Sequence, residues 1–230
     1  MTSQESPPRS RSMQWSWQKV ARRIRVPLGF VTAALYLFEL WRHAPQPKAI
    51  AWSLILVVPG LALRAYASGY VKKNRELTIT GPYAHTRNPL YLGSMLIAAG
   101  FALALLSWVV ALVLAAGFAI IYIPVIASEE RFLRATFPQF EQYSRRVPRL
   151  LPRLSPWRSQ TAFATAPNHG PARDAPPPAA ASATQARSGG FSLSLYLRHR
   201  EYNALLGAVL LYLSLLFLRP VLQAILRMAR

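Results

Sequence analysis

The distribution of apolar residues along the chain predicts a polytopic membrane protein. Five long apolar segments, separated by polar ones, cover approximately residues 24–41, 49–71, 90–106, 107–127 and 202–218. The stretch from Leu90 to Ala127 contains no Asp, Glu, Lys, Arg or His, and at about 1.5 Å per residue it is roughly twice as long as the hydrocarbon core of a bilayer is thick. We therefore expect an all-α fold with about five transmembrane helices, in which residues 90–127 form a helical hairpin that turns near Ser107.

The polar segments divide the chain into four predicted regions. Residues 1–23 are polar and basic and are expected to be disordered, whereas residues 24–153 form a four-span membrane core. The core ends in a segment after residue 127 whose apolar residues recur at helical spacing between charges, which indicates an amphipathic helix at the cytoplasmic membrane surface, interrupted at Pro138. Residues 154–190 are rich in Pro and Ala and predict a flexible linker. Residues 191–230 supply a last transmembrane helix and a short basic tail.

The charges are strongly unbalanced and predict the orientation of the spans. The chain has 27 Lys and Arg against 8 Asp and Glu, a formal net charge of +19, and the basic residues cluster before the first span, in 72–89 and after residue 127. By the positive-inside rule these segments face the cytoplasm, so we expect a multi-pass protein of the bacterial inner membrane with a cytoplasmic N-terminus. The same charges would contact anionic membrane lipids. Nucleic acid is not an expected partner, because no coherent basic face with interleaved aromatic residues is present.

Two further features limit the chemistry that the chain can perform. It has no cysteine, which excludes disulfides and thiolate chemistry, and its four histidines have no ligand spacing, so no metal site is expected. The second span contains Pro59, which suggests a kink, and Arg64, a charge inside the predicted membrane segment. An intramembrane Arg either extends its charged end to the cytoplasmic surface or lines a polar cavity.

The residues that carry chemistry gather in two loops on the same predicted side of the membrane. The segment "ITGPYAHTRNPLYLG", residues 79–93, precedes the hairpin, and a pair of carboxylates, Glu129 and Glu130, follows it. Because the two ends of a helical hairpin meet, Tyr91 and Glu129 are expected to be neighbours. Arg87 can then reach the Glu129–Glu130 pair at the membrane surface. The alternative is a structural role without function, in which the tyrosines belong to an interfacial aromatic belt and the carboxylates to a solvated helix end.

These two segments together resemble the isoprenylcysteine carboxyl methyltransferase family and the related phospholipid N-methyltransferases. The resemblance rests on "GPYAHTRNPLYLG", followed by "EERFL" and "RVPRLLP", and covers about residues 50–153. It implies an integral membrane enzyme that uses S-adenosylmethionine. The cofactor contacts that the resemblance implies are Arg75, Glu76, Leu77, Thr78, Tyr83, Asn88, Pro89, Leu90, Tyr91 and Glu129.

The chain departs from the family pattern at two positions that concern the methyl acceptor. Asn88 stands where the family has His, and an amide cannot act as a general base near neutral pH. Val125 stands where eukaryotic carboxyl methyltransferases have an Arg that meets the prenylcysteine. The resemblance therefore implies the methyl donor more firmly than the acceptor, which we expect to be a lipid or another hydrophobic small molecule, methylated on a carboxylate or a headgroup amine.

Methyl transfer from a sulfonium requires the protein mainly to align donor and acceptor and to exclude water. We assign this catalytic work to Arg87, Glu129 and Glu130; Arg87 either binds the methionine carboxylate of the cofactor or clamps its loop to a carboxylate. An amine acceptor would need a base, for which Glu130 or His85 is the candidate. Two other functions remain open: an NADPH-dependent membrane reductase of the sterol-reductase type, which has a segment similar to Arg87–Tyr91, and a non-catalytic membrane adaptor tethered by the linker.

Overall fold

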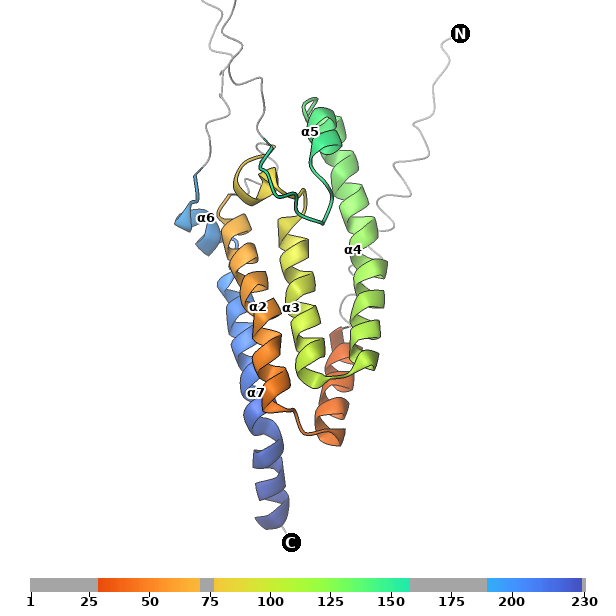
Figure 1. Cartoon of the computed structure of the whole chain (residues 1–230), viewed down its shortest axis with the longest axis vertical. Coiled ribbons are helices and arrows are strands. Elements are labelled where there is room, and N and C mark those ends of the chain that lie inside the picture. Colours follow the sequence, from red (N-terminus) through yellow and green to blue (C-terminus); the bar gives the residue numbers. More distant parts are fainter. Residues whose placement is uncertain (1–28, 71–76, 158–189, 229–230) are drawn as a thin grey trace, which may run out of the picture.

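The computed structural model describes residues 29–70, 77–157 and 190–228, and within these ranges every regular element is helical (Figure 1). The predicted disorder of residues 1–23 and most of the predicted linker lie outside the described residues. The elements are a helix that covers residues 29–42, α2 (Pro47–Ser68), the 3-10 helix η1 (Gly81–Ala84), α3 (Pro89–Leu105), α4 (Trp108–Thr136), α5 (Phe140–Arg146), α6 (Leu193–Arg198) and α7 (Tyr202–Met228).

Three of these helices are long and apolar enough to cross a membrane, which confirms the predicted helical membrane fold. They are α2, α4 and, over Tyr202–Ile225, α7, while α3 is a shorter apolar helix. The predicted hairpin is α3 and α4, and its turn consists of Leu106 and Ser107. Leu106 adopts the left-handed conformation with φ 49°, and the Ser107 hydroxyl accepts a hydrogen bond from the Val110 amide at 3.3 Å, which caps α4. At 29 residues, or about 43 Å, α4 is long enough to extend beyond the bilayer.

The helices α2 and α3 approach each other closely along small residues. A Cβ atom built on Gly93 would lie 2.7 Å from the carbonyl oxygen of Gly60, and one built on Gly60 would lie 2.8 Å from the carbonyl oxygen of Gly93. Gly100, two turns further along α3, is similarly close to Val57. Helices in a membrane associate through this kind of backbone contact, because burial of apolar side chains gains nothing relative to lipid. The contact fixes α3, and with it the start of the hairpin, against α2, which continues as a helix through Pro59.

The C-terminal helix α7 packs into the same bundle. Ala208 and Leu215 belong to the main buried cluster, together with Val57 of α2 and Phe101 of α3. The Tyr212 hydroxyl forms a hydrogen bond of 2.7 Å with the Ser53 hydroxyl of α2. Although the linker sets residues 191–230 apart in the sequence, the structure joins α7 to the other helices.

The segments 77–88 and 137–157 lie together at one end of the bundle, and we call them the cap (Figure 1). As expected, the helix that follows the hairpin is interrupted around Pro138, with α4 ending at Thr136 and α5 beginning at Phe140. Phe140 and Tyr143 of α5 are buried and form the centre of a second apolar cluster. The side chains packed around this centre are Leu77, Ile79, Leu133, Phe137 and Trp157. The cap thus has its own small core, which holds the two chemistry-bearing loops against each other.

Candidate functional site

The two loops of the cap are joined by their backbones. The Arg87 amide donates to the Pro148 carbonyl at 2.9 Å, and the Trp157 amide donates to the Ala84 carbonyl at 2.9 Å. Trp157 lies within the predicted linker, yet its ring also packs on Tyr143, with the centroids 5.5 Å apart. The ordered cap therefore extends to Trp157, and the segment 84–88 runs alongside residues 148–157.

Two polar side chains of the first loop strengthen this pairing. The buried Thr86 hydroxyl lies 3.1 Å from the carbonyl oxygens of both Arg149 and Leu150. The side-chain amide of Asn88 donates to the same Arg149 carbonyl at 3.0 Å. Asn88, which stands where the family has His, thus holds the second loop in place through its donor group. A neutral amide suffices for this contact, which needs no titratable ring.

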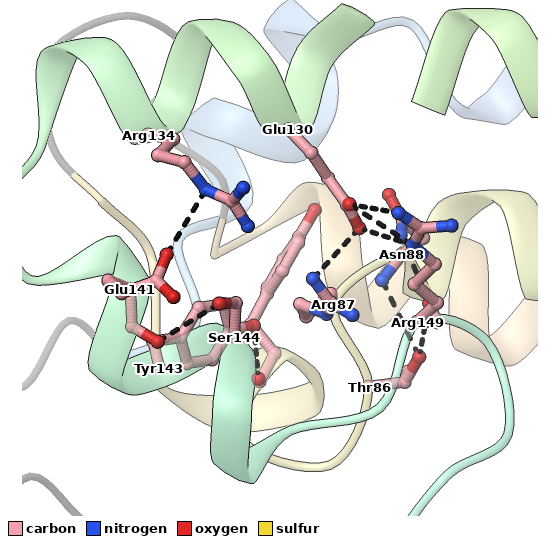
Figure 2. A network of polar contacts seen from close by, with 10 residues as sticks. Thr86, Arg87, Asn88, Glu130, Arg134, Glu141, Tyr143, Ser144 and Arg149 are labelled. Atoms are coloured by element: carbon pink, nitrogen blue, oxygen red, sulfur yellow. Dashed lines mark hydrogen bonds and ion pairs between the residues drawn. The ribbon is translucent and has the colours of Figure 1, made fainter. Parts of the chain in front are cut away.

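Glu130 is the centre of a charge network inside the cap (Figure 2). Its side chain points from α4 toward two guanidinium groups: Arg87 Nη1 lies 2.9 Å from Oε1, and Arg149 Nη2 lies 2.8 Å from Oε2. The side chains of Glu130 and Arg87 are only 9% and 13% exposed. Burial lowers the pKa of Arg87, and the charge of Glu130 opposes that shift. Of the two roles considered for Arg87, the geometry favours the clamp, because its guanidinium ties the first loop to α4.

Glu129, the neighbour of Glu130 on α4, faces a different environment. The Tyr91 hydroxyl donates to Glu129 Oε1 at 2.9 Å, so the two ends of the hairpin meet as predicted. The Tyr91 ring packs edge-on against Tyr122, with the ring centroids 5.1 Å apart. Successive residues of a helix point about 100° apart, and this rotation places Glu130 inside the cap while Glu129 stays exposed. Only Glu129 therefore presents its carboxylate to a ligand from solvent.

Tyr83 lies in the interior of the cap. The residue is buried, and its carbonyl accepts a hydrogen bond from the Tyr143 hydroxyl at 2.7 Å. Burial raises the pKa of the Tyr83 phenol, and the charges of Glu129 and Glu201 raise it further. Both carboxylates therefore act on the same phenol, although Glu201 belongs to the C-terminal segment just before α7. A neutral Tyr83 can donate a hydrogen bond but cannot serve as a base near neutral pH.

Arg64 is turned toward the interior of the bundle. Its Nη2 lies 2.7 Å from Glu201 Oε2, and its Nε donates to the same oxygen at 3.1 Å. Its Nη1 donates to the Ser94 hydroxyl of α3. Arg64 also lines an apolar cavity of about 680 Å³. Arg64 thus lines a cavity, as one of the two alternatives expected, but the cavity is mainly apolar rather than polar, and Glu201 compensates the charge of Arg64.

The remaining predicted cofactor contacts lie in the cap or at the start of α3. Leu77 packs against the apolar cluster of the cap, and Thr78 is half-buried beside it in the sequence. Pro89 is buried as the first residue of α3, and Leu90 follows in the same turn. The two predicted contacts outside the described residues are Arg75 and Glu76.

Sequence reasoning missed two residues that hold the site together. Arg149 enters it only as one of the basic residues that indicate orientation, and Glu201 is not assigned to the site. A signal existed for Glu201, because a carboxylate placed next to an apolar segment requires a partner of opposite charge. Among the described residues, no group of three or more His, Cys, Asp or Glu side chains is arranged to hold a metal ion.

Comparisons with known proteins relate part of the chain to a family. Residues 52–139 match the family model described as phospholipid methyltransferase. The cobalt-zinc-cadmium resistance protein CzcN of Cupriavidus metallidurans is 42% identical over 147 residues, which cover 60% of this chain and 66% of the relative. The nickel-cobalt-cadmium resistance protein NccN of Alcaligenes xylosoxydans xylosoxydans is 41% identical over 98 residues, which cover 43% of this chain and 45% of the relative.

The alignments thus cover less than two thirds of the length of each of these relatives. No solved structure matches the chain. The matched segment includes most of α2, the first loop of the cap, the hairpin and both carboxylates. Over residues 52–139 this chain therefore carries a segment of the phospholipid methyltransferase type, which supports a membrane methyltransferase.

Proposed function

We propose that the protein is a membrane methyltransferase that uses S-adenosylmethionine and methylates a lipid or another hydrophobic small molecule. The observation that carries this proposal is the contact between Tyr91 and Glu129, which holds the exposed carboxylate at the open end of the helical hairpin. Both residues lie within the segment that matches the phospholipid methyltransferase family. The apolar cavity reaches the partner of Tyr91, Tyr122, so that a hydrophobic acceptor has a place next to the same pair.

The residues at this position suit S-adenosylmethionine. Its positively charged groups and its hydroxyl groups complement the exposed carboxylate of Glu129, and a sulfonium is attracted to an aromatic face such as that of Tyr91. When bound, the cofactor supplies a methyl group on a positively charged sulfur. Glu129 and Tyr91 would then fix its position. Thr86 and Asn88 would hold the first loop of the cap against the second loop through their hydrogen bonds to the Arg149 carbonyl.

The hydrogen bonds within the cap also indicate which residue could take the proton from an amine acceptor. Both oxygens of Glu130 already accept hydrogen bonds or ion pairs from Arg87 and Arg149, so we no longer favour it as the base. His85 Nδ1 lies 2.8 Å from the Arg153 carbonyl, which can only accept, so this nitrogen carries the hydrogen in the neutral ring. The other ring nitrogen, Nε2, keeps its lone pair. We therefore propose His85 as the base if the acceptor is an amine, whereas a carboxylate acceptor needs none.

Calorimetric titration with S-adenosylhomocysteine tests the proposed function. We expect the purified protein in detergent to bind S-adenosylhomocysteine with 1:1 stoichiometry and to bind NADPH no better than buffer. NADPH serves as the comparison because a membrane reductase is the main competing function. Binding of NADPH without binding of S-adenosylhomocysteine would establish the reductase, and binding of neither would favour the adaptor.

We propose that the cap faces the cytoplasm of a bacterial inner membrane, as the distribution of basic residues indicates. The chain has no cysteine, so single cysteines introduced into it can be labelled without background. Ser155→Cys lies in the cap, and Pro45→Cys lies in the connection before α2, at the other end of the bundle. In intact spheroplasts, a membrane-impermeant maleimide should label only the Pro45→Cys variant, and the opposite pattern would show that the orientation is reversed.

A further inference from the structure

The apolar cavity lies between five helices and has one polar end. It is lined by the helix of residues 29–42, α3, α4 and α7 and by Arg64 of α2, and its volume of about 680 Å³ falls in the range of small-molecule sites, roughly 300–1,000 Å³. Along α3 its lining extends from Ser94 to Leu105, a distance of roughly 16 Å at about 1.5 Å per residue. Arg64 and Ser94, which are hydrogen-bonded to each other, are the polar groups at the end nearest the cap. An elongated apolar space with a polar end fits an amphiphile.

The polar end of the cavity adjoins the candidate methyl-transfer site through one aromatic contact. Tyr122 lines the cavity, and its ring lies 5.1 Å from that of Tyr91, whose hydroxyl binds Glu129. Glu201, the partner of Arg64, also acts on the buried Tyr83. A hydrocarbon chain in the cavity would therefore place its polar head next to the residues proposed to hold the methyl donor.

One wall of this cavity comes from α7. Ala204, Gly207, Ala208 and Leu211 line it, and their spacing places them on one face of the helix. A Cβ atom added at Gly207 would meet no atom within 4 Å, so this wall leaves open space in front of the helix. The contact between Glu201 and Arg64 holds the start of α7 against α2 at 2.7 Å. The position of this wall is thus fixed by a charge pair that is largely shielded from solvent.

We propose that α7 completes the acceptor site and selects the acceptor: the cavity holds one hydrocarbon chain of a membrane amphiphile, and the small-residue face around Gly207 sets the width available to it. This inference rests on the proposed function, and it assigns a specificity-determining role to a helix outside the matched segment 52–139. The polar head lies at Arg64, Ser94 and Glu201, which offer both hydrogen-bond donors and a negatively charged acceptor. Because Arg64 and Glu201 carry opposite charges, this end of the cavity suits a zwitterionic head group.

Two variants with the same new residue on opposite faces of α7 test this proposal. Gly207→Phe directs a ring into the open space of the cavity, whereas Val209→Phe adds the same ring at an exposed position two residues along the helix. Each variant and the unmodified protein are tested for binding of a 16-carbon lysophosphatidylethanolamine by native mass spectrometry. They are also tested for methyl transfer from radiolabelled S-adenosylmethionine to vesicles of a total bacterial lipid extract, and for affinity for S-adenosylhomocysteine.

We expect Gly207→Phe to reduce lysolipid binding and methyl incorporation at least tenfold, with unchanged affinity for S-adenosylhomocysteine. Val209→Phe should match the unmodified protein in all three measurements. Equal lysolipid binding by the two variants, or no lysolipid binding by the unmodified protein, would overturn the role of α7. Absence of S-adenosylhomocysteine binding to the unmodified protein would instead overturn the proposed function, so the two failures are distinguishable.

Discussion

Replacing Glu129 by Gln should lower the affinity for S-adenosylhomocysteine by roughly ten- to a hundredfold and leave the fold intact. Gln keeps an oxygen that can accept the hydrogen bond of the Tyr91 hydroxyl, now 2.9 Å from the carboxylate, so the variant removes the charge and little else. Hydrogen bonds to a charged group contribute about 1.5–3 kcal/mol, and each 1.4 kcal/mol or so corresponds to a factor of ten in affinity. Because Glu129 is exposed, its neutralisation should not disturb the buried packing of the cap.

Glu141→Gln is the matched control for this experiment. Glu141 is another exposed carboxylate at the same end of the molecule, where it pairs with Arg134 at 3.1 Å. Its replacement changes the net charge by the same amount and should leave both affinity and thermal stability unchanged. Calorimetry provides the affinities, and circular dichroism during heating provides the stabilities. If both variants lose affinity equally, the effect is one of overall charge, and if neither does, Glu129 is not a cofactor ligand.

The architecture of the hairpin could be predicted from the sequence because it depends on local properties. An uncharged run twice as long as a bilayer is thick must turn, and Ser107 supplies a cap at the turn. The place of α7 in the bundle could not be predicted in the same way. Apolar character shows that residues 202–218 can enter a membrane, but it does not show which helix they will contact. The contacts of α7 depend on distant residues, such as Ser53 for Tyr212 and Arg64 for Glu201.

The candidate site was partly predictable for a similar reason. The contact between Tyr91 and Glu129 depends only on the hairpin and not on the packing of the other helices, and the structure shows this contact. The different surroundings of Glu129 and Glu130 were not predictable, because they depend on the rotation of α4 relative to the cap. That rotation is set by tertiary packing, in which Phe140 and Tyr143 bury themselves against the first loop. The two adjacent carboxylates, both of which the sequence assigns to catalysis, are therefore expected to behave in opposite ways when substituted.

Replacing Glu130 by Ala should destabilise the cap, in contrast to the Glu129 substitution. The variant leaves the guanidinium of Arg87, only 13% exposed, without the carboxylate that lies 2.9 Å from it. Arg87 Nε is already buried without a hydrogen-bond partner among the described residues, so the charge has little other compensation. Breaking a buried ion pair by removing one partner costs about 3–5 kcal/mol. Arg149 should contribute less to this cost, because its side chain is 59% exposed and can be hydrated.

Limited trypsin digestion and thermal unfolding measure this effect together. The second loop contains Arg145, Arg146, Arg149 and Arg153, and release of the cap should make the bonds after these residues far more sensitive to cleavage. The double variant Arg87→Met, Glu130→Met is the control, because removing both charges avoids a buried unpaired cation, and it should recover most of the lost stability. A Glu130→Ala protein as stable and resistant as the unmodified one would show that the Glu130 network does not hold the cap. Loss of stability with recovery in the double variant would instead separate the structural carboxylate from the ligand-binding carboxylate next to it.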